Sequence, residues 1–336
     1  MSRCMRETVS VVIPTRDRPD QLRRAVSAAL CQRGVELEVV VVDDGSQPPA
    51  SPVEDPRIRV IRVEESAGVA SARNRGIAAA TGAWVAFLDD DDIWSPDRLS
   101  RQLDCASATD AHAVVCGTVV LDARGRALQL DPLPDVERLA QQLRGMNVLG
   151  GPSAVMVRRD LLRRVGGFDE TYSVLADWEL YLRLVDAEPF ALIPEILNGY
   201  VIHAAGMHVM ETDRAIAEFE RLERVHGCTR VENTPGMYSK HFLRWAGSAH
   251  RRAGRRRAAA ALYLRNWRRH GEHADLLRAL VIFLGEPVMK RLSRSRIDGP
   301  LERPSWVTLY LDPRDPDGEL RALGPGVTGI AAAEAE

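Results

Sequence analysis

The sequence predicts an α/β protein, in which a mainly parallel sheet with helices on both faces is followed by a mostly helical C-terminal region. Three observations lead to this prediction. Residues 8–88 have the pattern strand, helix, strand, strand, helix, strand, which is typical of a mainly parallel sheet covered by helices. Two of these strands, 8–15 and 37–42, are continuous apolar runs, as expected of strands buried on both faces. Beyond residue 211, long stretches of helical periodicity dominate instead.

Length, charge and cysteine usage narrow the class of protein. The chain has 336 residues, enough for one large domain or two, and its formal net charge of −2 gives no overall signature of nucleic-acid binding. Its five cysteines form no CxxC pair, which argues against a disulfide framework or a zinc site and is typical of a reducing compartment. Residues 1–15 lack the apolar segment of a signal peptide, and the apolar run 279–285 is too short to span a bilayer. We therefore expect a cytoplasmic protein.

The first elements are bounded by recognisable stop and start signals. Pro14 closes the strand 8–15, Asp17 can cap the helix that follows, and Pro19 lies in the first turn of that helix. Further strands are expected at 37–42, 57–63 and 83–88, and a helix at 68–80.

Two strands of this sheet end in aspartates. Asp43 and Asp44 follow the strand 37–42, and the run 89–92 consists of four aspartates directly after the strand 83–88. In parallel sheets, ligands bind outside the carboxyl ends of the strands, so both acidic clusters face the same rim. A solvated acidic loop, or a helix N-terminus that favours aspartate, is the alternative interpretation, but it explains one aspartate rather than four.

Four consecutive carboxylates need a positive partner. Neighbours roughly 5 Å apart repel by about 1 kcal/mol in water and by about 3 kcal/mol at an effective dielectric near 20. A divalent cation with oxygen preference, such as Mg²⁺ or Mn²⁺, or the edge of a polar ligand would offset this repulsion. If the extended geometry persists, Asp89 and Asp91 point to one side of the chain, and Asp90 and Asp92 to the other.

The usual phosphate-binding loops are absent from the sequence. No glycine occurs in the turn after the first strand, which excludes a GxGxxG loop, and no GxxxxGK[ST] motif occurs anywhere. A bound nucleotide would then need a cation and arginines for its phosphates. Of Arg73 and Arg75, which point to different sides of the helix 68–80, we expect one at the site and the other in solvent.

After the acidic run, the elements are less regular. Ser95 is expected to cap a helix that has Pro96 at its first position. The elements expected in this region are a helix at 96–108, a strand at 113–121, a hairpin turn at 122–126, a helix at 135–144 and a strand at 152–157. The pair Gly166 and Gly167 indicates a tight turn or a close backbone approach. Asp177 begins an amphipathic helix, where it is either an N-cap or a carboxylate presented to a cleft as a general base.

The C-terminal region has helical periodicity and a basic segment. Helices are expected at 212–225, 238–253, 256–270 and 274–292. The segment 250–270 carries eight arginines and two histidines around an apolar stripe. A solvated helical face explains this pattern, and docking to an acidic partner or an anionic membrane surface is the alternative. From residue 297 the chain is rich in Pro, Gly and Asp and is expected to be irregular.

Taken together, the motifs resemble those of a known enzyme family. The runs VSVVIPTRDRPDQLRRAVSAAL, VVVVDDGS, AGVASARNRGIAAATGAWVAFLDDDD and GGFDE, followed by an Asp-Trp pair, occur in this order within residues 8–205. They resemble the inverting glycosyltransferases of family 2, which have the GT-A fold. The resemblance implies a nucleotide-sugar-binding catalytic domain over 1–210. The change of sequence pattern beyond it predicts a helical domain, for acceptor binding or association, over 211–296 and an irregular tail over 297–336.

The resemblance also implies roles for individual residues. The nucleotide would be contacted by Thr15, Asp43, Asp44, Arg73, Asp89 and Asp90. The metal would be held by Asp91, with Asp89 and His203 as further ligands. Asp177 matches the catalytic base, with Ala176 where many members have a glutamate, and the acceptor side would include Gly166, Gly167 and Trp178.

The implied reaction is the transfer of one sugar from a nucleoside diphosphate sugar, UDP first among the nucleotides, with Mg²⁺ or Mn²⁺ as cofactor. The acceptor is a hydroxyl of a glycan, a lipid-linked sugar or a natural product, or else a peptide side chain. No nucleic-acid partner is expected. The expected location is the cytoplasm, with peripheral contact with the inner face of the membrane as the alternative. The alternatives are a sugar nucleotidyltransferase, which would need a glycine-rich loop after the first strand, and a non-catalytic scaffold of the same fold.

Overall fold

The computed structural model describes residues 7–131, 133–202, 212–226, 237–252, 254–284, 301–315 and 318–323. The chain divides into two compact units. Unit 1 comprises Met1–Val136, Leu149–Ile202 and Leu301–Glu336, and unit 2 comprises Glu137–Val148 and His203–Pro300. This division differs from the expected domain bounds in two places, because a short internal segment belongs to unit 2 and the C-terminal segment belongs to unit 1.

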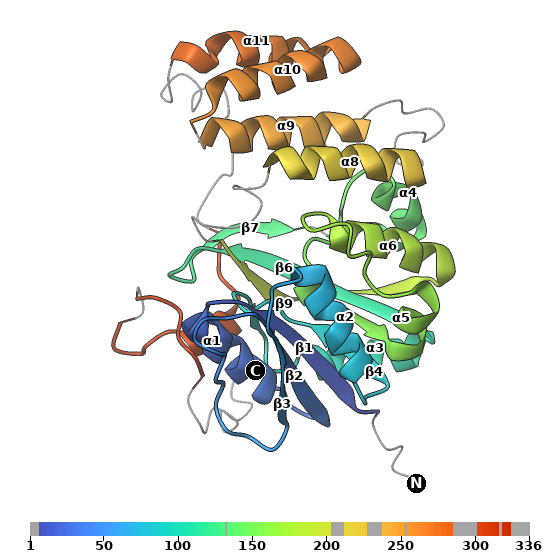
Figure 1. Cartoon of the computed structure of the whole chain (residues 1–336), viewed down its shortest axis with the longest axis vertical. Coiled ribbons are helices and arrows are strands. Elements are labelled where there is room, and N and C mark those ends of the chain that lie inside the picture. The colour runs from blue at the N-terminus through green and yellow to red at the C-terminus, as the bar shows by residue number, and fades with distance from the viewer. Residues whose placement is uncertain are drawn as a thin grey trace, which may run out of the picture. The chain divides into compact units, whose positions relative to one another are not determined.

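Unit 1 is built on one nine-stranded sheet (Figure 1). Its strands are β1 (Val9–Thr15), β2 (Leu37–Asp44), β3 (Ile58–Val63), β4 (Trp84–Phe87), β5 (Ile93–Trp94), β6 (Ala113–Leu121), β7 (Ala127–Asp131), β8 (Val155–Arg158) and β9 (Phe190–Val201). Its helices are α1 (Pro19–Leu30), α2 (Val69–Ala79), α3 (Arg98–Thr109), α5 (Arg159–Val165) and α6 (Ala176–Ala187), with short 3₁₀ helices at Pro152–Ala154 and Ser305–Tyr310.

The strand order is β3-β2-β1-β4-β8-β6-β9-β5, and β7 pairs with β6. Strands β3, β2, β1 and β4 are all parallel, as the apolar runs predict. The other half of the sheet is mixed, because β8 is antiparallel to both β4 and β6 while β9 is parallel to β6. Helices α1 and α2 pack against β1 and β2, and α3 packs against β6 and β9.

The parallel register places the ends of the first strands at one level. Thr15, the last residue of β1, is paired with Asp43 on β2. Val12, three residues before the end of β1, is paired with Phe87, the last residue of β4. The chain that leaves β4 therefore runs past the end of β1, and this brings the aspartates 89–92 beside Thr15.

Two predicted helix caps are wrong. Helix α1 has Arg18 at its N-cap position, and Asp17, at φ 56°, accepts a hydrogen bond of 2.7 Å from the backbone N–H of Gln47 instead. Helix α3 begins at Arg98 after Asp97, not at Pro96. The reason is that the backbone of Ser95 donates to Leu197 on β9, which continues the pairing of β5 with β9 before the chain can turn into the helix.

Unit 2 contains the helices α4 (Leu139–Leu143), α8 (Thr212–His226), α9 (Met237–Arg252), α10 (Arg256–His270) and α11 (His273–Val281). In sequence order from α8, each of these helices packs on the next. The apolar stripe of α10 is its buried face, and includes Ala259, Leu262 and Tyr263. Gly247 on α9 allows the close approach, since a Cβ there would lie 2.8 Å from the ring of Tyr263.

The arginines of α10 are exposed or paired with acidic residues of α8. Arg265 bonds Glu220 at 2.7 Å, and Arg269 bonds Glu223 at 3.2 Å. These contacts support the interpretation of the basic segment as a solvated helical face. Within the described ranges, none of the helices combines the length and the apolar character that crossing a bilayer requires.

Candidate active site

The four aspartates after β4 form a turn. The backbone N–H of Asp92 donates to the carbonyl of Asp89 at 3.1 Å, so the chain is not extended here. The expected alternation, with Asp89 and Asp91 on one side, is therefore wrong. Each carboxylate has its own direction and its own set of contacts. We call residues 89–92 the acidic turn.

Asp89 is paired with Arg73 of α2. The guanidinium NH2 of Arg73 lies 2.6 Å from Oδ1 of Asp89, and Arg73 is 6 % exposed. Burial alone would lower the pKa of Arg73, but Asp89 and then Asp177 outweigh it and raise the pKa. As predicted, only one of the two arginines faces this region: Arg75 is exposed.

Asp90 and Asp91 share Arg18, which lies between β1 and α1. Its NH1 is 3.0 Å from Oδ1 of Asp90 and 3.0 Å from Oδ2 of Asp91. Asp90 also accepts a hydrogen bond of 2.8 Å from Oγ1 of Thr15. Burial, followed by repulsion from Asp91, raises the pKa of Asp90 to about 7. The repulsion within the acidic turn is thus offset by arginines of the chain itself.

Asp92 is a buried residue that supports the turn. It is 1 % exposed, and its Oδ1 accepts a hydrogen bond of 3.2 Å from the backbone of Val201 at the end of β9. Burial, then repulsion from Asp91 and Asp89, raises the pKa of Asp92 well above its usual range. The backbone N–H of Asp89 donates to the hydroxyl of Ser153 at 3.0 Å. The two ends of the acidic turn are therefore held by different parts of the sheet.

The carboxylate of Asp43, at the end of β2, accepts hydrogen bonds from the loop that follows and from β3. Oδ1 accepts from the backbone of Ser46 at 2.9 Å, and Oδ2 accepts from Ala50 at 2.9 Å and from Arg62 at 2.7 Å. Burial alone would raise the pKa of Asp43, but these hydrogen bonds outweigh it and lower the pKa. An ionised carboxylate at this position fixes the shape of the loop 45–50 beside Thr15.

Asp44 holds the start of α2. Its carboxylate accepts hydrogen bonds of 2.6 Å from the Ser66 hydroxyl, 2.9 Å from the backbone of Ala67 and 3.0 Å from the backbone of Gly68. Gly68 is the N-cap residue of α2, the helix that carries Arg73. Asp44 thus acts on the site through the position of α2.

Asp177 lies in the first turn of α6, where Leu175 is the N-cap residue. The interpretation of Asp177 as an N-cap is therefore wrong. Its charge and that of Asp89 both act on Arg73 and on the buried hydroxyl of Tyr181. Burial, then repulsion from Asp177, raises the pKa of Tyr181 well above its usual range. The charge of Asp177 on α6 therefore acts on the same arginine as Asp89 of the acidic turn.

The glycine pair after α5 makes a close contact with α2. Gly166 and Gly167 have φ of 84° and 68°, and a Cβ on Gly167 would lie 2.5 Å from Oδ1 of Asn74. Asn74 also accepts from the backbone N–H of Phe168 at 2.8 Å. The prediction of a tight turn and a close approach is confirmed. Trp178 is 2 % exposed and packs in the core, and its place on the acceptor side stays a prediction.

Sequence reasoning missed Arg18 and Ser153. Arg18 follows β1 at the same carboxyl edge as the aspartates that follow β2 and β4, so the rule applied to those strands could have found it. Ser153 stands in a region expected to be a strand but forms a 3₁₀ turn before β8, and no local signal marks its hydroxyl as a partner of Asp89.

Carboxylates of the acidic turn could supply some of the ligands of a divalent cation. Within the part of the chain that the structure describes, no group of three or more His, Cys, Asp or Glu side chains is arranged as a metal site. The side chains of Asp89 and Asp91 are 26 % and 20 % exposed and offer the oxygen donors that Mg²⁺ and Mn²⁺ prefer. One or two carboxylates suffice where substrate phosphates and water complete the coordination. His203 lies outside the described residues.

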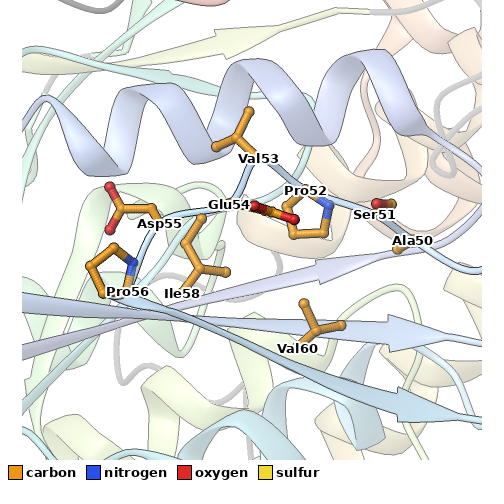
Figure 2. A pocket seen from close by; sticks show the side chains of 9 residues that line it. All are labelled: Ala50, Ser51, Pro52, Val53, Glu54, Asp55, Pro56, Ile58 and Val60. Atoms are coloured by element: carbon orange, nitrogen blue, oxygen red, sulfur yellow. The ribbon is translucent and has the colours of Figure 1, made fainter.

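An open hollow lies elsewhere on unit 1 (Figure 2). The loop between β2 and β3 and the strand β3 line it, with Pro52, Glu54, Asp55 and Val60 among the contributing residues. None of the residues expected to bind nucleotide or metal is among those that line it. We therefore place the candidate active site at the acidic turn and not at this hollow.

Comparisons with known proteins are consistent with this arrangement. Residues 10–166 match the family Glycosyl transferase family 2. The succinoglycan biosynthesis protein ExoO of Rhizobium meliloti is 35 % identical over 211 residues, which are 58 % of this chain and 60 % of that protein. The pre-mycofactocin glycosyltransferase of Mycobacterium tuberculosis is 38 % identical over 204 residues, which are 55 % of this chain and 42 % of that protein. The chain thus spans about half the length of these two relatives.

Among solved structures, a crystal structure of S. aureus TarS 1-349 superposes with a TM-score of 0.51 at 16 % identity, covering 85 % of this chain and 82 % of that one. A second crystal structure, of the same protein in complex with UDP, gives a TM-score of 0.50 at 17 % identity. At this level of identity the likeness concerns the fold.

Proposed function

We propose that the chain, of which residues 10–166 match glycosyl transferase family 2, is an inverting, metal-dependent glycosyltransferase. It would move one sugar from a nucleoside diphosphate sugar to an acceptor. UDP is the first nucleotide to test, because TarS, which shares the fold, is known in complex with UDP. The acceptor classes are a hydroxyl of a glycan, a lipid-linked sugar or a natural product, and a peptide side chain.

The observation that carries the proposal is the ion pair of Asp89 with Arg73 beyond the carboxyl ends of the parallel strands, together with the charge of Asp177, which acts on the same arginine. Arg73 bonds Asp89 at 2.6 Å, and its charge interacts with that of Asp177. A cluster of opposite charges at this edge suits a substrate that combines a diphosphate with a polar sugar. The same cluster joins elements far apart in sequence, which a coincidental acidic loop does not explain.

The roles follow from the surroundings of each side chain. Asp89 and Asp91 would hold Mg²⁺ or Mn²⁺, which when bound offsets the charge of the departing diphosphate. Arg73 and Arg18 would bind phosphate oxygens. Asp177 would take the proton of the acceptor hydroxyl as this oxygen attacks the anomeric carbon from the face opposite the nucleotide, so that the configuration inverts.

The remaining predicted residues would keep this arrangement in shape. Thr15 and Asp90 are bonded to each other, Asp43 holds the loop beside them, and Asp44 holds the start of α2. We propose that these four contribute mainly through the shape of the nucleotide site. Gly166 and Gly167 would set the path of the backbone on the acceptor side.

A donor screen tests the proposal. Purified protein is mixed with UDP-, GDP- and dTDP-sugars, with Mn²⁺, with Mg²⁺ or with EDTA, and the release of free nucleotide is followed together with the thermal unfolding midpoint. We expect one donor to raise the midpoint and to be slowly hydrolysed, in the presence of metal only. If no donor binds or is hydrolysed under any condition, the enzyme proposal fails and a non-catalytic scaffold of the same fold takes its place.

A further inference from the structure

The C-terminal segment 301–323 is part of unit 1, although the sequence predicts an irregular tail. Val307 and Tyr310 are fully buried, and Leu320 and Leu323 are 6 % and 7 % exposed. Near the end of the segment, the backbone N–H of Arg321 donates to the carbonyl of Tyr310 at 2.7 Å. The described residues of this segment, 301–315 and 318–323, thus pack against unit 1.

One contact of this segment reaches Trp94, two residues after the acidic turn. The hydroxyl of Tyr310 donates to the carbonyl of Trp94 at 2.6 Å, across 216 residues of sequence. The indole N–H of Trp94 donates to the carbonyl of Ser153 at 2.8 Å, and the hydroxyl of Ser153 accepts from the backbone of Asp89. Tyr310 therefore ends a chain of hydrogen bonds that begins at the first residue of the acidic turn.

A second contact passes through Arg24 on α1. Its NH2 donates to the backbone carbonyl of Asp91 at 3.0 Å, and its NH1 donates to the carbonyl of Leu320 at 3.4 Å. One turn further along α1, the hydroxyl of Ser27 accepts from the backbone of Leu323 at 2.9 Å. One face of α1 thus binds the acidic turn and the C-terminal segment together.

The bond from Arg24 goes to the backbone of Asp91 and not to its carboxylate. Arg24 is 9 % exposed, and a guanidinium buried at that level is unfavourable unless its N–H groups are bonded. A backbone bond of this kind restrains the position of the turn without occupying a carboxylate oxygen. Such positioning matters most at a binding site where a displacement of about 1 Å weakens the affinity for the ligand.

We propose that residues 301–315 and 318–323 position the acidic turn for the nucleotide through two routes, the hydrogen bonds that lead from Tyr310 to Asp89 and the more direct bridge of Arg24, and that Arg24 is the positioning residue of the second route. The proposal rests on the function proposed above. It assigns to the C-terminal segment an influence on nucleotide affinity, in addition to its contribution to the stability of unit 1.

The test measures the affinity of the full chain for UDP in the presence of Mn²⁺ by isothermal titration calorimetry. The variants are Arg24→Met, Arg24→Lys and Tyr310→Phe. The last of these removes a single hydroxyl. The control is Arg321→Gln, because Arg321 lies in the same segment but is 58 % exposed and bonds only Asp312 among the ion pairs of the described residues. Thermal unfolding midpoints are measured for every variant.

We expect Arg24→Met to raise the dissociation constant of UDP about tenfold and Tyr310→Phe to raise it about threefold, at temperatures where both variants are fully folded. Arg24→Lys is expected to resemble Arg24→Met, because one ammonium cannot reproduce the planar fork that spans the two carbonyls. Arg321→Gln should bind as the wild type does. If Arg24→Met fails to fold, Tyr310→Phe and Arg24→Lys decide the matter.

The inference and the proposed function fail in different ways. If the wild type binds UDP and the variants bind it equally well with only lower unfolding midpoints, the segment is a structural layer and the inference is overturned. Full rescue by Arg24→Lys would likewise overturn the bridging role. If the wild type itself binds neither UDP, GDP nor dTDP, the proposed function fails and the inference falls with it.

Discussion

The guanidinium of Arg73 on α2 lies 2.6 Å from the carboxylate of Asp89, the first residue of the acidic turn that follows the core strand β4. The arginine is almost fully buried, whereas the carboxylate is partly exposed. A buried cation is stable only with such a partner, and the exposed side of the carboxylate remains open to a ligand. The pair therefore couples the stability of α2 to the geometry of the site.

Replacement of Arg73 by methionine should therefore affect both stability and binding. We expect Arg73→Met to lower the free energy of unfolding by about 2 kcal/mol, the typical cost of removing a partner from a charged hydrogen bond, and to weaken nucleotide binding. Arg75→Met is the control, because Arg75 is exposed on the same helix and its loss should change stability by less than about 0.5 kcal/mol. Urea unfolding of both variants makes the comparison; equal effects would contradict the account.

Arg18 and a divalent cation should compete for Asp91. NH1 of Arg18 lies 3.0 Å from Oδ2 of Asp91, so a cation that binds this oxygen has to displace it. We expect Arg18→Met to bind Mn²⁺ about tenfold more tightly in the absence of nucleotide, and to bind UDP more weakly in the presence of EDTA. Calorimetric titrations with MnCl₂ and with UDP measure the two effects. Arg16→Met, which removes an exposed arginine of the same loop, should leave both unchanged.

Gly76 should be required for the contact between α2 and the sheet. A Cβ at this position would collide with the side chain of Val12 on β1. Overpacking of this kind costs about 1–3 kcal/mol, more than the roughly 0.5–1 kcal/mol that alanine gains over glycine within a helix, so Gly76→Ala should be destabilising.

The matched control is Gly151→Ala. Gly151 has φ −72°, and a Cβ added there would have no atom within 4 Å, so this substitution should be neutral or slightly stabilising. The thermal unfolding midpoints of the two variants separate a packing requirement from a general effect of glycine replacement. A stable Gly76→Ala protein would show that α2 is not packed as described.

The stability of unit 2 should fall in mildly acidic solution. Burial, then the charge of Arg255, lowers the pKa of His250 despite its contact of 3.3 Å with Asp213. A histidine whose pKa is lower in the folded chain contributes stability above the pKa of the unfolded state, about 6.5, and this stability is lost as the pH falls through the folded-state pKa.

Amide hydrogen exchange in α9 and α10, measured at pH 7.5 and pH 5.5 and corrected for intrinsic rates, should therefore show reduced protection at the lower pH. His250→Gln should reduce this difference, whereas replacement of the exposed His273 should not. An identical pH dependence in His250→Gln and the wild type would contradict the assignment.

The parallel half of the fold could be predicted because β1, β2 and β4 are apolar runs, and two of them, β2 and β4, lead into aspartates. That pattern is local, and the register of β1 with β2 and β4 then brings Thr15 beside Asp43 and the acidic turn. The same reasoning could not give the geometry of the turn itself. The direction of each carboxylate depends on Arg18, Arg73 and Val201, which approach from other parts of the chain.

The C-terminal segment is where the sequence-based interpretation differs most from the structure, for a related reason. Its Pro, Gly and Asp content predicts a chain without regular structure, and among the residues described there, 301–315 and 318–323, a 3₁₀ helix forms at Ser305–Tyr310. Composition does not reveal that Tyr310 contacts Trp94 of the sheet, 216 residues earlier, or that Leu320 contacts Arg24 of α1, 296 residues earlier. Contacts of such sequence separation leave no periodic signal.

The most direct test of the central claim separates binding from turnover at Asp177. With the donor identified in the screen, wild type, Asp177→Asn and Asp186→Asn are compared for donor affinity and for the rate of nucleotide release. Asp186 is an exposed residue of the same helix and serves as the control. If Asp177 is the base, Asp177→Asn binds the donor with the wild-type affinity but releases nucleotide at least about 100-fold more slowly, as expected on loss of a general base. Turnover by Asp177→Asn at the wild-type rate would contradict the account.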